Sequence, residues 1–381
     1  MLTLTDEQEQ RAKRLQHESF VFDYFPRGEP MTLSPSEEKA MDDALAAGTP
    51  AGAVLNVIVD RRTKDIASDP AAADRLLSMW QASGVNAVTC TLGGLDPRYD
   101  DRENLVRDRA RWQRRFEVAD YITHCHSADE LERAFAEGKV GVFMNLQNAT
   151  YLGDDLSNLD VLYDFGVRMI QLTYNRRNLL GDGCTERVQG GLTHFGVQAV
   201  KRMNELGIVV DTGHCGIQTT LDAMDASSQP IAISHSGSRV VYDHPRNKTD
   251  DQMRALADHD GYMGVYTVPY FICNDPDPQL DIFLAHFEHC ANLVGLERMG
   301  IGTDWGSWSL DLPARLRAGV EEVFATRGFQ GYRQAHTVGE LVAYTDWIHI
   351  TRALVSRGYR DAEVQGILGG NFLRFLRRAV G

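Results

Sequence analysis

The feature that most constrains the fold of this chain is a succession of short apolar runs, separated by stretches with helical periodicity. Each run is almost continuously apolar and rich in β-branched residues, as expected of parallel strands buried on both faces. We count eight runs, at Ser19–Tyr24, Asn86–Leu92, Val140–Leu146, Arg168–Tyr174, Gly207–Asp211, Pro230–His235, Gly261–Thr267 and Arg298–Asp304. Eight strands that alternate with helices predict an α/β fold, a closed (β/α)8 barrel of the TIM type.

Two segments are longer than an ideal barrel requires. Residues 28–77 make a long, mostly helical insertion after the first strand, and residues 312–381 predict C-terminal helices that close the barrel. A short additional strand is expected at Tyr121–His124, just before a helix at Asp129–Glu137. The sequence contains no internal repeat, so we expect a single domain over residues 1–381.

Charge and apolar pattern exclude several classes of partner. The chain has 39 Lys and Arg residues against 53 Asp and Glu residues, a net charge of −14, which disfavours binding to nucleic acid or to an anionic membrane surface. No apolar run approaches the ~20 residues of a membrane helix, and the N-terminus lacks the apolar segment of a secretory signal. The six cysteines are scattered, without a CxxC pair. We therefore expect a cytoplasmic protein with reduced cysteines.

In a barrel of this type, reactive side chains lie at the carboxyl ends of the strands. His214 follows the fifth predicted strand, His235 ends the sixth, and Asp304 ends the eighth. A lone histidine is more often a structural hydrogen-bonding residue, but two at neighbouring strand ends with a carboxylate nearby favour a metal site. Imidazole nitrogens combined with oxygen donors suit zinc or iron.

Two further patterns leave alternatives open. Arg246, in the loop after the sixth strand, either binds a substrate carboxylate through two parallel hydrogen bonds or is an ordinary loop charge. His124 and His126 have the spacing that places both side chains on one face of a strand, as in some metal sites. A helix follows directly, so we favour a position for His126 at the entry of that helix.

Four motifs carry a resemblance to a known family. They are VVDTGHCG (209–216), IAISHSGSRVVYDHPRN (231–247), MGIGTDW (299–305) and LGGNFLR (368–374). Their order and spacing resemble the membrane (renal) dipeptidase family, the M19 metallopeptidases, from about Leu15 to Arg377. The resemblance implies a (β/α)8 barrel, commonly dimeric, that holds two zinc ions and hydrolyses small dipeptides. We therefore expect a homodimer that acts on a small molecule.

The resemblance also implies roles for individual residues. His214 and His235 match the two histidines that ligate the second zinc ion of the family. Arg246 matches the arginine that binds the substrate carboxylate. Asp304 matches the aspartate that moves protons for the attacking water, and Asn371 matches an asparagine that contacts the substrate.

The sequence departs from the family at the first zinc site. Where the family has Asp-Gly-His-Asn-Asp, this chain has Asp23-Tyr24-Phe25-Pro26-Arg27, so Phe25 replaces a ligating histidine and Arg27 a ligating aspartate. Gln147 replaces the glutamate that bridges both metal ions. Tyr174 replaces a histidine that touches the substrate.

Charge decides how many metal ions we expect. Arg27 and Gln147 change the two carboxylate positions from −2 to +1. Two dications ~3.5 Å apart without a bridging anion repel each other by roughly 19 kcal/mol, even at an effective dielectric constant of ~20. We therefore predict one zinc ion rather than two, held by His214, His235 and water, with the side-chain carbonyl of Gln147 as a further ligand. Asp304 is an alternative ligand, which would give a set of two histidines and one carboxylate.

The sequence thus predicts a metal-dependent hydrolase of a small dipeptide or amide that bears a carboxylate. Asp304 would act as general base and then as general acid. Arg246, Asn371 and Tyr174 would bind and orient the substrate, and Arg27 would clamp a second anionic group. One alternative is a catalytically inactive or metal-free barrel that binds a small carboxylate or a partner protein, or acts as a lyase. Another is a barrel with a purely structural metal.

Overall fold

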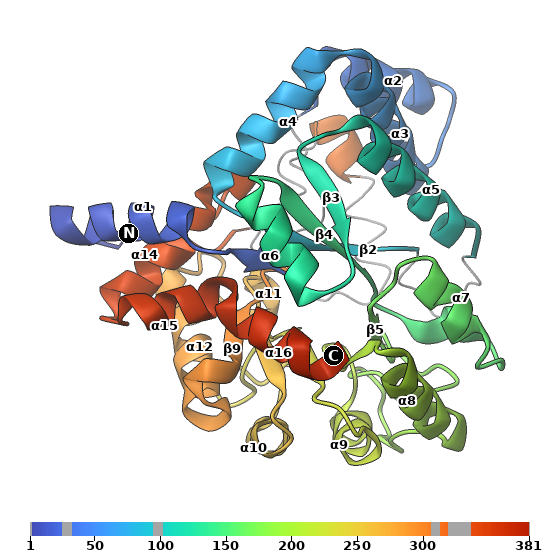
Figure 1. The fold of residues 1–381 in the computed structure, drawn as a ribbon, viewed down its shortest axis with the longest axis vertical. Coiled ribbons are helices and arrows are strands. Elements are labelled where there is room, and N and C mark those ends of the chain that lie inside the picture. The colour runs from blue at the N-terminus through green and yellow to red at the C-terminus, as the bar shows by residue number, and fades with distance from the viewer. Residues whose placement is uncertain (1, 25–32, 94–101, 306–312, 319–336, 381) are drawn as a thin grey trace.

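The computed structural model describes residues 2–24, 33–93, 102–305, 313–318 and 337–380 (Figure 1). In these residues eight parallel strands follow one another in the order β1-β2-β4-β5-β6-β7-β8-β9. They are β1 (Phe22–Asp23), β2 (Ala87–Thr91), β4 (Val140–Leu146), β5 (Met169–Gln171), β6 (Val209–Asp211), β7 (Ala232–Ser236), β8 (Tyr262–Val265) and β9 (Met299–Ile301). The barrel nearly closes between β9 and β1, where the backbone N–H of Thr303 donates to Asp23 Oδ1 at 2.9 Å. The predicted (β/α)8 fold is confirmed.

The short additional strand β3 (Ile122–Cys125) pairs with β4 outside the barrel order. It pairs with residues 140–143 of β4, whereas β5 pairs with residues 145 and 146. Strand β2 pairs with the opposite edge of β4. Strands β3 and β5 therefore pair with the same edge of β4, β3 along the first half of that edge and β5 along the second half. The extra strand expected from the sequence is therefore present.

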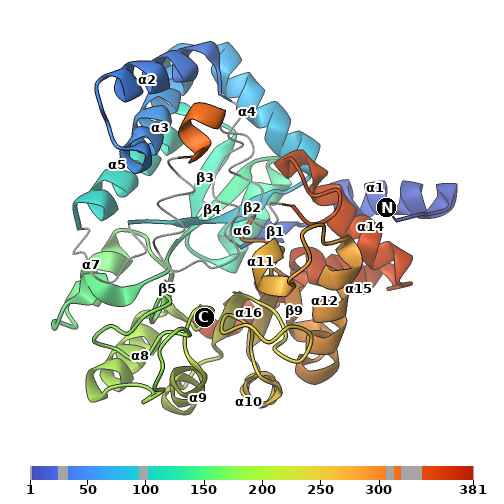
Figure 2. The ribbon, with the colours of Figure 1, turned by 180° about the vertical axis from the view of Figure 1, so that it is seen from behind.

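Helices surround the strands on the outside (Figures 1 and 2). Those described here are α1 (Asp6–Glu18), α2 (Pro35–Ala46), α3 (Ala51–Ser68), α4 (Pro70–Ser83), α5 (Arg102–Val118), α6 (Ala128–Ala136), α7 (Asn158–Asp164), α8 (His194–Leu206), α9 (Ile217–Ala226), α10 (Asp250–Asp258), α11 (Pro269–Ile272), α12 (Leu280–Val294), α14 (Ile348–Ser356), α15 (Asp361–Gln365) and α16 (Asn371–Val380). Local signals set their starts: α10 begins with a reciprocal capping box between Thr249 and Gln252.

Helices α2, α3 and α4 lie within the long segment that separates β1 from β2, and they pack with α5 above the barrel in Figure 1. A buried ion pair joins the first two of them, because Arg62 Nε donates to Glu37 Oε1 at 2.7 Å. Arg111 of α5 donates to Asp60 of α3 at 2.6 Å. Charged contacts thus help to hold these helices together.

Helix α16 fills the end of the barrel at which the strands begin. The ring of Phe372 stacks on Phe22 of β1, with centroids 3.7 Å apart and an interplanar angle of 7°. Phe372 also makes edge-on contacts with Phe143 of β4 and Tyr262 of β8. With this end occupied by aromatic side chains, a site for a small molecule belongs at the opposite end, where the strands finish.

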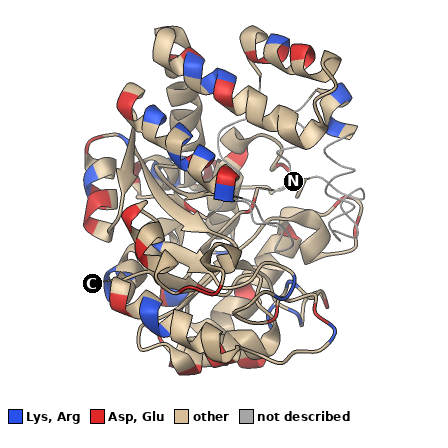
Figure 3. Cartoon of the chain, turned by 90° about the vertical axis from the view of Figure 1, so that its right-hand side faces the viewer, with Lys and Arg blue, Asp and Glu red and all other residues tan. Residues whose placement is uncertain are grey.

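On the side of the molecule drawn in Figure 3, the charged residues of the described part are of both signs. Figure 3 shows Lys and Arg residues interspersed with Asp and Glu residues along the outer helices, and exposed pairs such as Lys39 with Asp43 lie one helical turn apart. Among these residues, no helix is both long enough and apolar enough to cross a membrane.

Candidate active site

Two histidines meet at the end of the barrel where the strands finish. His214 follows β6, and His235 lies near the end of the neighbouring strand β7. Their Nε2 atoms are 3.0 Å apart, and both residues are buried. The prediction that these two residues lie together is thus met in the structure.

The surroundings of His214 determine where its proton lies. Its Nδ1 is 2.6 Å from Asn175 Oδ1, and its backbone N–H donates to Gln171 Oε1 at 3.1 Å. The ring of Tyr174 stacks on the imidazole, with centroids 4.0 Å apart. Because an amide oxygen only accepts hydrogen bonds, Nδ1 carries a proton, and Nε2 is the ring nitrogen that faces His235.

His235 is held from two sides. The ring of Tyr24 stacks against it, with centroids 5.2 Å apart and an interplanar angle of 21°. Its Nδ1 lies 2.8 Å from Ser234 Oγ, which also lies 2.6 Å from Asp211 Oδ2. Contacts at both Nδ1 atoms therefore turn the two Nε2 atoms toward each other.

The residues present fit one bound cation. Zinc–nitrogen bonds of about 2.0–2.1 Å in a tetrahedral site place two ligating nitrogens roughly 3.3 to 3.4 Å apart, so the two rings would separate by a few tenths of an ångström from their 3.0 Å distance to hold a zinc ion. Gln147, at the end of β4, is 1% exposed, and its Nε2 has no hydrogen-bond partner. The same amide carries a carbonyl oxygen, which can act as a neutral oxygen donor to a cation. Among the described residues, no group of three or more His, Cys, Asp or Glu side chains is placed to hold a metal ion.

The described residues do not offer a carboxylate for a second metal ion at the end of β1. Asp23 accepts hydrogen bonds from the Thr303 backbone and hydroxyl at 2.9 and 2.7 Å, from Tyr344 at 2.9 Å and from Trp347 at 3.2 Å. Burial raises the pKa of this carboxyl to about 6. Both of its oxygens are thus engaged in joining β1 to β9 and to the segment before α14.

Arg246 is a buried cation without an acidic partner among the described residues. It is 1% exposed and donates from Nη1 to Gly213 O and from Nη2 to His235 O. The rings of Tyr266 and Phe271 each lie 5.5 Å from its guanidinium carbon. Its Nε has no hydrogen-bond partner. Such a guanidinium favours a bound anion, because a buried charge needs compensation.

Asp304 follows β9 in an unusual backbone conformation. Its φ of +43° lies in the left-handed region, which a residue with a side chain rarely adopts. The residue is 5% exposed, and its N–H donates to Tyr24 O at 3.5 Å. Backbone strain of this kind is concentrated at functional sites. The next residue, Trp305, has a buried Nε1–H without a hydrogen-bond partner.

Other predicted positions have different outcomes. Asn371 donates from Nδ2 to Leu296 O at 2.9 Å and to Met299 O at 2.7 Å, which places it where β9 begins. This is the end of the barrel filled by α16, so the predicted contact of Asn371 with substrate does not fit and is corrected to a structural role. Arg27 and Phe25 lie outside the described residues.

Three neighbours of the histidines, Tyr24, Asn175 and Ser234, are not assigned a role in the site from the sequence. The signal that marks them is a polar side chain at the end of, or inside, an otherwise apolar run. Cys215, next to His214, is buried in the structure. Burial raises the pKa of its thiol to about 11, so it is a poor nucleophile.

The second pair of histidines, His124 and His126, lies just before the start of helix α6. The backbone N–H of His126 donates to Glu130 Oε2 at 2.7 Å, and its ring Nδ1 is 3.1 Å from the same oxygen. His124 stacks on Phe116 with an interplanar angle of 3°, and burial lowers its pKa to about 3. Both contacts support the structural interpretation of this pair over a metal site.

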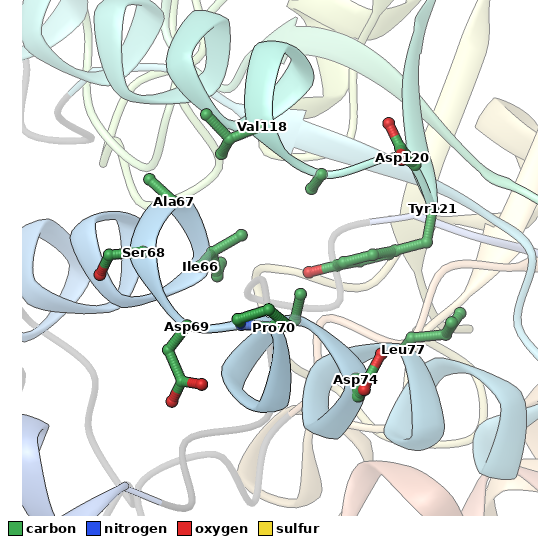
Figure 4. Close-up of a pocket in the computed structure, with 12 residues that line it drawn as sticks. Ile66, Ala67, Ser68, Asp69, Pro70, Asp74, Leu77, Val118, Asp120 and Tyr121 are labelled. Atoms are coloured by element: carbon green, nitrogen blue, oxygen red, sulfur yellow. The ribbon is translucent and has the colours of Figure 1, made fainter.

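One cavity of the described residues lies away from these side chains. It has a volume of about 470 Å³ between α3, α4 and the connection from α5 to β3. Tyr121 points into it in Figure 4, with Asp69, Asp74 and Asp120 along its rim. Since β3 starts here, the cavity is at the opposite end of the strands from His214 and His235.

Comparisons with known proteins agree with this arrangement. The sequence profile of the membrane dipeptidase family (peptidase family M19) matches residues 108–316. A dipeptidase of Claviceps purpurea, tcpJ, is 27% identical over 262 residues, which cover 68% of this chain and 56% of the relative. An uncharacterised dipeptidase of Schizosaccharomyces pombe is 30% identical over 231 residues, 59% of this chain and 53% of the relative. The chain thus spans about half the length of these curated relatives.

A solved structure of an amidohydrolase from Pseudomonas aeruginosa has the same fold. It superposes with a TM-score of 0.73 and 23% sequence identity, over 97% of this chain and 99% of that chain. At this level of identity the likeness concerns the fold, and it extends over nearly the whole barrel and its helices.

Proposed function

Because the chain belongs to the membrane dipeptidase family, peptidase family M19, we propose that it is a metal-dependent hydrolase of a small dipeptide or amide with a free carboxylate. The observation that carries this proposal is the buried His214–His235 pair, whose Nε2 atoms face each other at 3.0 Å. Two lone pairs at this distance repel unless a proton or a metal ion lies between them. The two nitrogens therefore either share a proton or hold a metal ion between them, and we propose the metal ion.

We propose one metal ion for this site, held by His214, His235 and Gln147. A zinc ion bound there would act as a Lewis acid on the scissile carbonyl and would lower the pKa of a bound water. Support for one ion rather than two comes from the first strand, where the oxygens of Asp23 are fully engaged and the family's ligating histidine is Phe25.

The other side chains of the site would supply binding and proton transfer. Arg246 would bind the substrate carboxylate, since its buried Nε–H lacks a partner and no described carboxylate pairs with the guanidinium. Asp304 would accept a proton from the attacking water and return it to the leaving amine nitrogen. Tyr174, stacked on His214, would form part of the wall against which the substrate is oriented.

The test combines metal content with turnover. Protein purified without added metal, and again after zinc loading, is analysed for zinc per chain and assayed on a panel of dipeptides and N-acyl amino acids. We expect close to one zinc per chain, and we expect His214→Ala to lose both zinc and turnover. His259→Ala, which removes a half-buried histidine bonded to Gln229 O, is the matched control and should keep both.

Two results would contradict the proposal. Full zinc content and full turnover in His214→Ala would exclude the metal site described here. Wild-type protein that neither binds zinc nor turns over any member of the panel would instead favour a metal-free barrel that binds a small carboxylate. About two zinc ions per chain would leave the hydrolase proposal standing and overturn only the choice of one ion.

A further inference from the structure

A buried chain of hydrogen bonds reaches His235 from the side opposite to His214. Ser234 Oγ lies 2.8 Å from His235 Nδ1 and 2.6 Å from Asp211 Oδ2. Tyr24 OH donates to the same carboxylate oxygen at 3.0 Å, and Asn145 Nδ2 donates to Tyr24 OH at 2.9 Å. All of these residues are fully buried, so water does not compete for the bonds.

The position of each proton follows from counting donors. Asp211 Oδ1 accepts from the backbone N–H groups of Gly213 and Ser234, both at 3.0 Å. Its Oδ2 faces the hydroxyls of Ser234 and Tyr24. Burial raises the pKa of the Asp211 carboxyl group, and the four donors around it act in the opposite direction by favouring the ionised, acceptor-only form. The single hydroxyl proton of Ser234 is therefore given to Asp211, and Ser234 Oγ accepts from His235.

We propose that Asp211, acting through Ser234, fixes the proton of His235 on Nδ1, and that Tyr24 is a positioning residue that holds Asp211 for this task. The inference deepens the proposed function and rests on it, because it explains how the Nε2 atom of His235 is kept available to a metal ion. Partners of this kind orient the ligands of many metal sites.

Two properties of this chain make the arrangement specific to it. Tyr24 stands where the family motif has glycine, so the link from β1 to Asp211 is supplied by a side chain that the motif lacks. The site also has Gln147 where the family has a carboxylate. Asp211 is a buried carboxyl group on this side of the pair, and only Ser234 lies between it and His235.

The proton positions can be read without metal or substrate. The full chain is labelled with 15N-histidine and kept metal-free, and the His235 signals are identified by their loss in His235→Gln. We expect a protonated Nδ1 at His235 in the wild-type protein. In Ser234→Ala that proton loses its acceptor, so we expect the Nδ1–H signal to broaden by exchange or the proton to move to Nε2.

Matched variants separate positioning from general loss of packing. Tyr24→Phe keeps the ring that stacks on His235 and removes only the hydroxyl. Tyr344→Phe removes an equally buried hydroxyl that donates at 2.9 Å to another carboxylate, Asp23. Ser236→Ala removes a buried hydroxyl of the same strand that donates to Arg246 O instead. We expect changed His235 signals in Tyr24→Phe and unchanged signals in both controls.

Metal affinity gives the second readout. With Co2+ as the probe, we expect affinity to fall about 10- to 100-fold in Ser234→Ala and about tenfold in Tyr24→Phe, and less than about twofold in Tyr344→Phe. An unprotonated Nδ1 in wild-type His235, or equal effects of Tyr24→Phe and Tyr344→Phe, would overturn the inference. A protonated Nδ1 that responds to Ser234→Ala in a protein that binds no Co2+ would overturn the proposed function alone.

Discussion

The guanidinium of Arg246 donates a hydrogen bond to the backbone carbonyl of His235 at 3.2 Å. Arg246, the proposed carboxylate-binding residue, is therefore hydrogen-bonded to strand β7, which carries the proposed metal ligand His235. A second bond from Arg246 to Gly213 O ties it to the segment that carries the other ligand. In the proposed complex, backbone atoms would thus set the distance between the substrate carboxylate and the metal ion, which would restrict the length of substrate that can span the two.

Arg246→Lys tests this carboxylate-binding role. Lysine keeps the charge but loses the planar fork, so it cannot bond both carbonyls and an anion together. A lost charge-assisted hydrogen bond corresponds to about 1.5–3 kcal/mol, so we expect KM for carboxylated substrates to rise about 10- to 100-fold. Steady-state kinetics on paired substrates, one with a free carboxylate and one with its amide, measure this. Equal losses on both members of the pair would contradict the role.

Asp23 gives a prediction for the pH dependence of stability. Its pKa is raised to about 6 in the folded protein by burial, from an ordinary value of 3.8. Between these values the folded state holds more protons than the unfolded state, so the contribution is present at low pH and is lost as pH rises through about 6. This difference in pKa between the two states corresponds to about 3 kcal/mol.

The measurement compares wild type with Asp23→Asn, which does not titrate, by denaturant unfolding from pH 4 to pH 7. We expect the wild-type free energy of unfolding to fall relative to the variant by about 2–2.5 kcal/mol over this range, because the unfolded-state carboxyl group is already partly ionised at pH 4. Asparagine also turns an acceptor into a donor next to Tyr344 and Trp347, so the variant is less stable at every pH. Parallel curves for the two proteins would show that Asp23 titrates normally.

The buried ion pair of the helical segment between β1 and β2 should matter for stability and not for catalysis. Glu37→Gln leaves the guanidinium of Arg62 buried without its anion, and we expect a loss of about 3–5 kcal/mol. Lys39→Ala breaks an exposed pair with Asp43 on the same helix and should change stability by less than about 0.5 kcal/mol. Chemical unfolding measures both. A change in zinc affinity in Glu37→Gln would be unexpected, since this helix lies away from the histidine pair.

Asn371→Ala checks the corrected role of that residue. The substitution leaves the carbonyls of Leu296 and Met299 without their donor, so we expect a loss of about 2–3 kcal/mol in the free energy of unfolding. KM and kcat of the folded variant should stay at wild-type values. A rise in KM without a loss of stability would restore the contact with substrate predicted from the sequence.

The strands were predictable because burial on both faces leaves a continuous apolar run in the sequence. The ends of the strands were less predictable. Strands β5 and β6 have three residues each, whereas the apolar runs that predict these two strands are longer. The reason is that Leu172 and Tyr174 after β5 remain buried at the rim and extend the apolar pattern beyond the paired strand. Burial and strand pairing are separate properties, and the apolar pattern of a sequence indicates only burial.

The site was predictable where it depends on strand order alone. His214 and His235 follow neighbouring parallel strands, whose ends meet at one rim whatever the details of packing. Asn371 comes from a helix, and its motif does not reveal which end of the barrel that helix covers. The contact of Tyr24 with Asp211 joins residues on non-neighbouring strands through the barrel interior, so it depends on the direction of one side chain.

Helix α16 also has a consequence for how the protein is made. The ring of Phe372 fills the space between strands that are all synthesised before it, so the interior at that end stays open until this helix leaves the ribosome. Until then Phe22, Phe143 and Tyr262 face an unfilled space, and such exposed aromatic surface promotes association between unfinished chains. A premature stop codon before residue 371 would therefore yield every barrel strand and still leave a chain inclined to aggregate.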